Sequence, residues 1–324
     1  MHRRTLLARL PLLAAPLAAP VIPRAFAADF GGFLAGLRSR AIAKGIPPAI
    51  ANAALAGMTP NAEVIHADQH QPEFTLTWAQ YSARVVTPAR IAKGQTKFAA
   101  VRNILASIVA QYGVSAEPIL GIWGIETNYG GFQGDFQVIN ALATLAYFRT
   151  STYFANEAIA AMRIAARGDA PLPQLTGSWA GAMGQPQFMP SVYLSTAVSF
   201  TGNGRPDIWN SDADALASIA NYLRKAGWVA GLPSSEPVLI PGNFNTFLAG
   251  RDHRFSLARW QALGVRRLAN AKPLPGSTPA SLLLPDGPSG AAYLVYGNFL
   301  AIRRYNPSDL YALAVGELGG AITA

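Results

Sequence analysis

The sequence has no cysteine in its 324 residues, which removes several kinds of chemistry at once. Disulfide bonds, thiolate metal sites, cysteine nucleophiles and a thioether-linked lipid anchor all need a thiol. Histidine is also scarce. Apart from His2 near the N-terminus, the chain has His66, His70 and His253, which are too dispersed to predict a metal cluster. A P-loop and the G-x-S-x-G turn of serine hydrolases are missing as well. Any reaction must therefore depend on other side chains.

Charged residues are few, at 13% of the chain against 51% hydrophobic residues. This composition excludes disorder and a coiled coil, and the length allows one large domain or two smaller ones with a cleft between them. The chain has 26 Lys and Arg against 17 Asp and Glu. Its basic residues are scattered along the chain, which argues against nucleic acid as a partner.

Residues 1–27 have the features of an export signal. Arg3 and Arg4 precede an apolar run from Leu10 to Ile22, and Ala25-Phe26-Ala27 supplies a cleavage site. The arginine pair leaves the general secretory and the twin-arginine routes both open. The run is shorter than the ~20 residues that span a bilayer and contains prolines, so we expect a cleaved signal and no membrane anchor.

Removal of this signal takes away four arginines and no acid, so the mature chain keeps 22 basic and 17 acidic residues. A moderately basic exported protein favours anionic partners, which outside the cytoplasm are cell-wall glycan strands with peptide carboxylates, or anionic lipids. We therefore expect a periplasmic protein. Further partners, such as other cell-wall enzymes, stay open, as does the oligomeric state.

Apolar periodicity predicts a mostly α (α+β) protein. Helical spacing covers residues 30–112, 116–129, 138–148, 153–166 and 214–226 and returns after residue 301. Short apolar runs at 238–240, 281–284 and 292–295 lie among prolines and glycines and predict strands. The segments expected from these patterns are a signal at 1–27, an N-terminal helical layer at 28–98, a helical core at 99–228, a small β-rich insertion at 229–300 and a returning helical segment at 301–324.

Glu126 is the acid with the most unusual surroundings. It lies near the end of the apolar helix predicted at 116–129, three residues after Trp123. Desolvation and the negative end of the helix dipole both raise the pKa of a carboxyl group, which favours a protonated general acid near neutral pH. A glutamate set against a tryptophan in an apolar pocket is the arrangement of the general acid in lysozyme. The other interpretation is a helix-end glutamate paired with a surface arginine.

A glycosidase ordinarily needs a second carboxylate. Asp135, Glu157 and Asp169 are candidates, but each is more typical of a solvated or capping acid. Without a second carboxylate the substrate must supply its own nucleophile, in an intramolecular attack. Residues 178–190 are a further candidate, because small residues let the backbone approach a ligand and Gln187 can bind sugar hydroxyls and acetamides. A tight helix-to-loop packing motif is the alternative for that segment.

Several distinctive blocks of sequence follow one another along the chain. They are Gly121 to Gly130, Ser178 to Pro190, Gly204 to Trp209, Ala220-Asn221-Tyr222-Leu223 with Gly227-Trp228, and Arg304-Tyr305-Asn306. Together these blocks resemble the lytic murein transglycosylase B family, in its soluble, non-lipidated form, and the resemblance runs from about Gln71 to Gly319.

This resemblance implies a lysozyme-like fold and cleavage of the bond between N-acetylmuramic acid and N-acetylglucosamine in peptidoglycan. It implies that Glu126 protonates the glycosidic oxygen and then acts as base on the C6 hydroxyl, which closes a 1,6-anhydro ring. The residues expected to bind saccharide or position the acid are Tyr81, Ser178, Gln187, Phe188, Tyr222, Tyr305, Asn306 and Tyr311. Exo or endo action and preferences for glycan length or stem peptide stay open.

No cofactor is expected. Some members of the family carry an EF-hand-like calcium loop, and the equivalent segment here is Ser199 to Asp207. Ser199, Thr201 and Asn203 occupy the first, third and fifth positions, and Asn210 stands where a bidentate acid is expected. We therefore expect a plain turn and no bound calcium.

Two rival functions stay open at this point. The first is a muramidase, a hydrolase in which Asp135 positions a water for Glu126. The second is a non-catalytic scaffold that binds glycan in its groove. The apolar surroundings of Glu126 argue against the scaffold, because binding alone does not need them.

Overall fold

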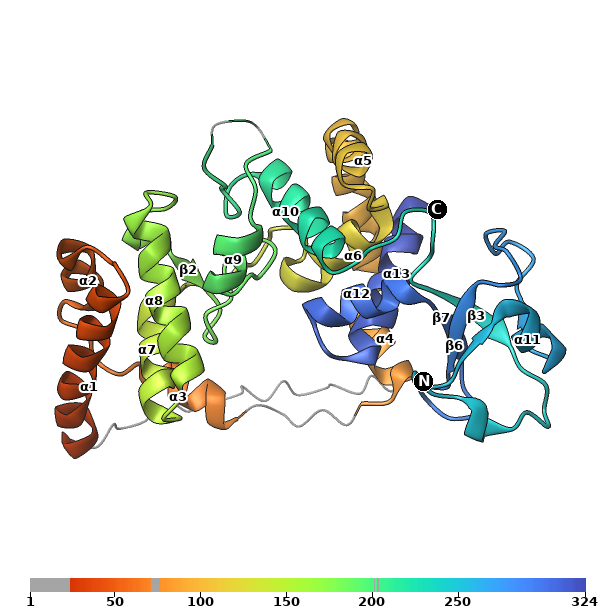
Figure 1. The fold of residues 1–324 in the computed structure, drawn as a ribbon, viewed down its shortest axis with the longest axis horizontal. Coiled ribbons are helices and arrows are strands. Elements are labelled where there is room, and N and C mark those ends of the chain that lie inside the picture. Colours follow the sequence, from red (N-terminus) through yellow and green to blue (C-terminus); the bar gives the residue numbers. More distant parts are fainter. Residues whose placement is uncertain (1–23, 71–75, 201, 203) are drawn as a thin grey trace, which may run out of the picture.

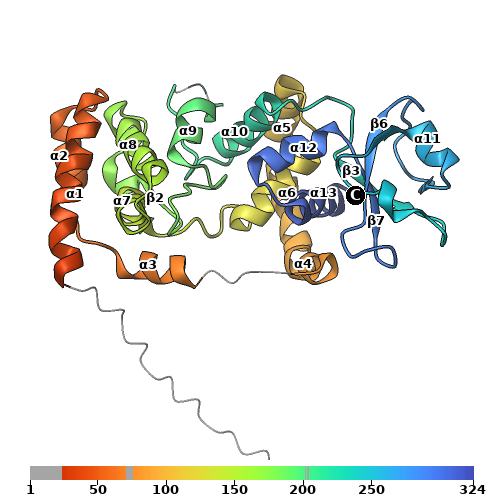
Figure 2. The same ribbon diagram turned by 60° about the horizontal axis from the view of Figure 1, so that its bottom comes forward.

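The computed structural model describes residues 24–70, 76–200, 202 and 204–324. The predicted export signal lies almost wholly outside these residues, and the first helix, α1 (Arg24–Ala43), begins near its end. The described chain forms three groups of elements along one long axis (Figure 1). Figure 2 shows the same three groups after a turn of 60°.

The first group is helical and has its own core. It contains α1, α2 (Pro48–Leu55), α3 (Ala62–Gln69), α7 (Val138–Phe148), α8 (Thr152–Ala166) and α9 (Pro190–Thr196). Leu37, Leu142 and Ile159 are buried at its centre. The short strands β1 (Phe136–Gln137) and β2 (Thr176–Gly177) pair antiparallel beside α7.

The middle group is built around α6 (Ala116–Thr127), whose apolar residues are buried on nearly all sides. The helices around it are α4 (Trp78–Val85), α5 (Pro88–Tyr112), α10 (Asp212–Lys225), α12 (Gly297–Tyr305) and α13 (Asp309–Thr323). Gly121 lets α13 approach closely, because a Cβ there would lie 2.2 Å from the carbonyl oxygen of Val315. Close packing of α6 on α13 brings the end of α6 next to the first turn of α13.

The third group is a five-stranded antiparallel sheet with the strand order β4-β6-β7-β3-β5. Its strands are β3 (Ser235–Leu239), β4 (Arg254–Ser256), β5 (Arg266–Arg267), β6 (Pro279–Leu283) and β7 (Ala292–Val295). The short helix α11 (Leu257–Ala262) buries Trp260 against one face. Tyr293 and Val295 on the other face join the core of the middle group.

The mostly helical fold with a small sheet confirms the predicted fold class. The predicted boundary between residues 98 and 99 falls within α5, which is continuous there. The N-terminal helices are shared between groups, because α1, α2 and α3 pack on α7 or α8 while α4 packs on α13. The division into the other segments stays a prediction.

In the part of the chain that the structure describes, no single helix is both long and apolar enough to cross a membrane. The pair α5 and α6 reaches the required length and composition only jointly, with a bend of 117° between the two helices.

Candidate active site

Glu126 lies in the last turn of α6, where it is half-buried. Burial raises the pKa of its carboxyl group from the ordinary 4.5 to about 7, against the opposing effect of a hydrogen bond from Tyr311. The Tyr311 hydroxyl donates that bond to Glu126 Oε1 over 2.6 Å. Among the described residues no arginine or lysine forms an ion pair with Glu126, so the interpretation as a surface ion pair is wrong.

Three tyrosines from three different helices surround this carboxyl group. Tyr81 comes from α4, Tyr305 from the end of α12 and Tyr311 from the first turn of α13. The pKa values of all three hydroxyls are raised by burial and, to a lesser extent, by the negative charge of Glu126. The tyrosines therefore stay neutral at physiological pH. They are hydrogen-bond donors, which can stabilise the carboxylate when it forms.

An aromatic cluster continues from Tyr305 towards the first group of helices. The ring of Tyr305 lies 4.7 Å from that of Tyr222 and 5.8 Å from that of Phe188, measured between ring centroids. The Tyr305 hydroxyl donates a hydrogen bond to the carbonyl oxygen of Pro186. Phe188 is buried, whereas Tyr222 and Tyr305 are partly exposed. These rings join the cores of the first and middle groups beside Glu126.

The other three predicted site residues lie on flanking loops and hold those loops in shape. Ser178 Oγ accepts a hydrogen bond from the backbone of Ala182. Gln187 Nε2 donates to the carbonyl oxygens of Gln133 and Gly184 over 3.0 and 2.9 Å. Asn306 Oδ1 accepts from the backbone of Ser308. No hydrogen bond joins Ser178, Gln187 or Asn306 to Glu126 within the described ranges, so their role towards a ligand stays a prediction.

The sequence suggested that Trp123 lines the pocket of Glu126, but in the structure its indole N–H is directed at Gln185. Its fully buried indole donates from Nε1 to Oε1 of Gln185 over 2.6 Å and packs edge-on against Tyr129. The residues that interact with the Glu126 carboxyl group through charge or a hydrogen bond are Tyr81, Tyr305 and Tyr311. Burial of the acid, which the sequence predicted, is thus achieved by residues that lie far from Glu126 along the chain.

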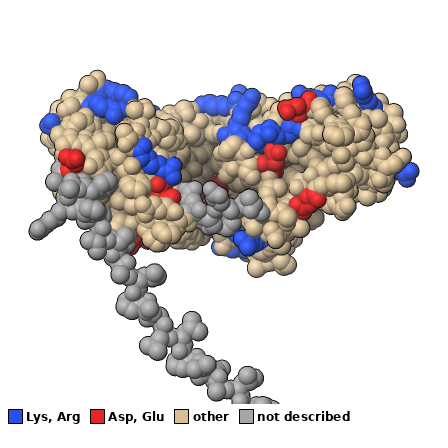
Figure 3. All heavy atoms as spheres, turned by 90° about the horizontal axis from the view of Figure 1, so that it is seen from below, with Lys and Arg blue, Asp and Glu red and all other residues tan. Residues whose placement is uncertain are grey.

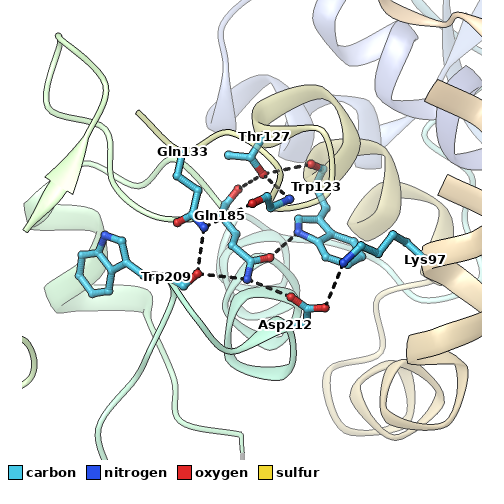
Figure 4. Close-up of polar contacts among 8 residues, drawn as sticks. Lys97, Trp123, Thr127, Gln133, Gln185, Trp209 and Asp212 are labelled. Atoms are coloured by element: carbon cyan, nitrogen blue, oxygen red, sulfur yellow. Dashed lines mark hydrogen bonds and ion pairs between the residues drawn. The ribbon is translucent and has the colours of Figure 1, made fainter. Parts of the chain in front are cut away.

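A polar network around Gln185 is the part of the site that the sequence did not reveal (Figure 4). Gln185 Nε2 donates to Oδ1 of Asp212 over 3.0 Å, and the hydroxyl of Thr127 donates to the Gln185 carbonyl oxygen over 2.9 Å. Lys97 lies 3.7 Å from Asp212 and 5.5 Å from the centroid of the Trp123 ring. One signal was present, since a buried tryptophan requires an acceptor for its indole N–H.

Asp135 is exposed in the loop that follows α6. It lines a surface pocket of about 380 Å³ together with Phe132, Gln174 and Asn210. The other two candidates for a second carboxylate have structural partners. Glu157 accepts hydrogen bonds from the backbone and hydroxyl of Ser191, and Asp169 pairs with Arg167.

The loop compared with a calcium site is held by Asp214, whose side chain is fully buried. Its two oxygens accept hydrogen bonds from the backbone N–H groups of Phe200 and Asp207, over 2.8 and 2.9 Å. Residues 201 and 203 lie outside the described residues, so the expected lack of calcium stays a prediction. No group of three or more His, Asp or Glu suited to a metal ion occurs in the described ranges.

A helical fold with a buried carboxyl group whose pKa is raised to about 7, enclosed by tyrosines, has the features of an enzyme that uses a general acid. The chain matches the transglycosylase SLT domain family over residues 29–320 and belongs to that family. This confirms the family relationship and the lysozyme-like fold predicted from the sequence.

Individual proteins that this chain resembles include lytic transglycosylases. The chain is 37% identical over 255 residues to the membrane-bound lytic murein transglycosylase B of Escherichia coli, which covers 76% of this chain and 67% of the relative. It is 43% identical to SltB3 of Pseudomonas aeruginosa, solved in complex with NAG-anhNAM-pentapeptide, with a TM-score of 0.86 over 91% of this chain and 80% of that one. It is 30% identical to the Escherichia coli lytic transglycosylase Slt35, solved with bulgecin A, with a TM-score of 0.76 over 92% of this chain and 93% of that one.

Proposed function

We propose that this protein is a lytic transglycosylase that cleaves the β-1,4 bond between N-acetylmuramic acid and N-acetylglucosamine in peptidoglycan. The observation that carries the proposal is the burial of the Glu126 carboxyl group beside Tyr311, which raises its pKa to about 7 and favours a proton on the group near neutral pH. Family membership and the resemblance to SltB3 complexes with NAG-anhNAM-pentapeptide and NAG-NAM-pentapeptide support it.

The reaction needs one carboxyl group in two successive roles. Glu126 gives its proton to the glycosidic oxygen as the bond from that oxygen to C1 of the muramic acid breaks. The C6 hydroxyl of the same sugar then forms a bond to C1, and its proton passes to the Glu126 carboxylate. The enzyme returns to its starting state, and no water is consumed. Tyr311 stabilises the carboxylate between the two steps by its hydrogen bond.

The remaining predicted residues are assigned to glycan binding. Tyr222 and Tyr305 provide partly exposed aromatic rings beside the acid, packed on the buried ring of Phe188, and Ser178, Gln187 and Asn306 add polar groups on the flanking loops. Tyr81 and Tyr311 position and desolvate the acid. Support comes from the arrangement of the tyrosines around Glu126 and from the matching sequence blocks.

An exported, periplasmic location belongs to the same proposal. The family match begins at residue 29, directly after the predicted cleavage point, and residues 1–27 have the composition of a signal. Basic side chains are spread over the face of the molecule shown in Figure 3 without gathering in one patch. That distribution suits an extended anionic polymer such as the glycan strand with its stem peptides.

Product analysis tests the function directly. Purified sacculi are digested with the protein, and the released muropeptides are identified by mass spectrometry. We expect 1,6-anhydromuramic ends, which are lighter by one water than the reducing ends left by a hydrolase. Reducing ends alone would contradict the proposal and favour the muramidase.

Two substitutions separate the rival functions. In D135N the transglycosylase keeps its rate to within about twofold, because an exposed acid outside the contacts of Glu126 has no part in the intramolecular attack, whereas a muramidase loses most of its rate. In cells, E126Q abolishes the effect of the enzyme on the wall, whereas a binding scaffold keeps its whole effect.

A further inference from the structure

We propose that Gln185 is a positioning residue for the reaction, because its side-chain amide and its backbone carbonyl together hold the last turn of α6 and thereby the place of Glu126. The inference rests on the proposed function. Gln185 is 3% exposed and is unlike the glycan-facing residues, since its polar atoms are all used within the protein.

Gln185 makes bonds in two opposite directions (Figure 4). Towards α6, its Oε1 accepts from Trp123 Nε1 and its carbonyl oxygen accepts from the Thr127 hydroxyl. Towards α10, its Nε2 donates to Asp212 Oδ1 over 3.0 Å and to the carbonyl oxygen of Trp209 over 3.4 Å. Gln185 therefore ties the end of α6 to the start of α10.

The bonds on the α6 side bracket Glu126 in the sequence. Trp123 precedes the acid by three residues and Thr127 follows it directly. The helix ends there, because Asn128 and Tyr129 adopt left-handed backbone angles with φ of 50° and 61°. The carbonyl groups of Trp123, Gly124 and Thr127 accept hydrogen bonds from backbone N–H groups of the turn that follows the helix. Gln185 adds bonds to the side chains of Trp123 and Thr127, on the side of α6 that faces α10.

The space around Gln185 fits this role. A Cβ on Gly130, just after the helix, would lie 2.8 Å from Gln185 Oε1, so the turn after α6 packs directly on the amide. The hydroxyl of Thr127 also accepts a hydrogen bond from the backbone N–H of Gly130 over 3.0 Å. Helix end, turn and amide thus form one packed unit.

The segment that carries Gln187 has supports of its own. Met183 and Phe188 exchange two backbone hydrogen bonds, and the Tyr305 hydroxyl bonds to Pro186. Removal of the Gln185 side-chain bonds should therefore disturb α6 more than the glycan-facing loop. For that reason we expect the turnover number kcat to change and KM to stay nearly constant.

The chemistry of the network gives a rescue experiment. An amide is needed at residue 185 because Trp123 requires an acceptor and the Asp212 carboxylate requires a donor. In Q185E the introduced carboxylate still accepts from Trp123 but faces Asp212, and the two negative charges repel each other. In Q185E/D212N the amide at residue 212 donates to the carboxylate at residue 185, so the bond between these two side chains forms with donor and acceptor exchanged, and only the longer bond to the Trp209 carbonyl oxygen is lost. D212N alone keeps an acceptor for Gln185.

The experiment measures kcat and KM for release of anhydro-muropeptides by the wild type and these variants, with the melting temperature of each. We expect kcat of Q185E to fall about tenfold, KM to stay within about twofold, and kcat of Q185E/D212N to recover at least half of the wild-type value. Q137E is the matched control, since Gln137 is exposed and outside the network, and it should keep the wild-type kcat.

A pH profile separates positioning from mere stability. Q185M fills the site without any of the side-chain hydrogen bonds. The titratable groups around Glu126 are the neutral Tyr81, Tyr305 and Tyr311, and the charged groups Asp212 and Lys97 lie beside Gln185. Burial is the main cause of the raised pKa of Glu126, so water admitted by a loosened last turn in Q185M lowers that pKa. We therefore expect the alkaline limb of the Q185M profile to move to lower pH.

Several results would overturn the inference. One is a kcat of Q185E equal to that of the wild type. Another is a Q185E/D212N variant that regains the wild-type melting temperature without regaining kcat. A third is a Q185M variant with an unshifted alkaline limb. A wild type that releases no anhydro product would instead overturn the proposed function itself, so the two failures are distinguishable.

Discussion

Glu126 lies between two sides of the molecule that differ in chemistry. One side, contributed by α4, α12 and α13, is made of tyrosines with raised pKa values, and its one direct bond to the acid comes from Tyr311. The other side, contributed by residues 184–187 and the start of α10, is a hydrogen-bonded amide network that contacts Trp123 and Thr127 but not the carboxyl group itself.

The two sides therefore have different roles towards Glu126. The tyrosine side removes water from the acid and so sets its pKa, because burial is the largest cause of the shift. The amide side fixes where the acid lies, because its bonds end on the residues before and after Glu126. Loss of the Tyr311 hydrogen bond should therefore move the alkaline limb of the rate profile to higher pH. Changes on the amide side should lower kcat and, where they admit water to Glu126, move that limb to lower pH.

The largest effect is expected where the two sides meet. E126Q removes the proton donor and the base, so kcat should fall by about 10³-fold or more, in line with the usual contribution of general acid–base catalysis. The measurement is the initial rate of anhydro-muropeptide release. E157Q is a control for loss of a buried carboxylate elsewhere, because Glu157 bonds only to Ser191 in the described contacts. Equal losses in both variants would contradict a special role for Glu126.

E126Q should also change the pH dependence of stability. The pKa of Glu126 is raised on folding, so below its unfolded value of about 4.5 the acid is protonated in both states and costs nothing. As the pH rises towards about 7, the unfolded chain releases this proton more readily, and the free energy of unfolding of the wild type falls. E126Q lacks this loss. Its melting temperature relative to the wild type should thus be higher at pH 8 than at pH 4, and a constant difference would contradict the raised pKa.

Y311F should have the next largest effect. The Tyr311 hydroxyl stabilises the charged form of Glu126, and its hydrogen bond lowers the pKa of the acid. Loss of a hydrogen bond to a charged group costs roughly 1.5–3 kcal/mol, so the pKa should rise by about 1–2 units. The alkaline limb of the rate profile should move to higher pH, opposite to the shift expected for Q185M. If the alkaline limbs of Y311F and Q185M moved in the same direction, the tyrosine side and the amide side would not differ in their effect on the pKa of Glu126.

Glu126 and its helix could be predicted from the local sequence, whereas the tyrosines around the acid could not. Glu126 was found because an acid in an apolar helix is conspicuous, and Gly130-Gly131 marked the end of that helix. Helix α7 was predicted at its observed bounds because its apolar spacing is uninterrupted. Tyr81, Tyr305 and Tyr311 came only from the resemblance to the family, since nothing in their local sequence predicts that three helices meet at one carboxyl group.

The amide side was not predictable by the same means. Gln185 bonds to Trp123, which is 62 positions away in the sequence, and to Asp212, which is 27 positions away. The partner of a buried amide depends on how loops and helices pack, and no periodicity or spacing records this. Trp123 was accordingly interpreted as a wall of the acid's pocket, whereas its indole N–H is directed at Gln185.

Y293F tests how the tyrosine side is held in place. The Tyr293 hydroxyl in β7 donates to Glu317 over 2.5 Å and accepts from Trp78 Nε1 in α4 over 3.0 Å, so it links the sheet to two helices of the site. Its loss leaves buried polar groups unpaired and should lower the free energy of unfolding by about 1–3 kcal/mol, measured in urea. Y153F, at a tyrosine that is 53% exposed, is the control and should change little. An unchanged stability of Y293F would show that α4 is held by other contacts.

The smallest effect is expected at the outer edge of the amide side. Lys97 and Asp212 lie 3.7 Å apart and are 36% and 38% exposed, so water and salt screen their attraction. Such pairs contribute about 0.2–1 kcal/mol, and the Lys97 contact with the Trp123 ring adds a similarly small amount. K97M keeps most of the aliphatic packing, and its kcat should stay within about threefold of the wild type, with a stability difference that shrinks as salt is added. A loss of kcat as large as that of Q185E would place the control of Glu126 in the charge of Lys97 and not in the amide. The salt dependence of the rate would separate the two, because salt screens the exposed ion pair and not the buried bond between Gln185 and Trp123.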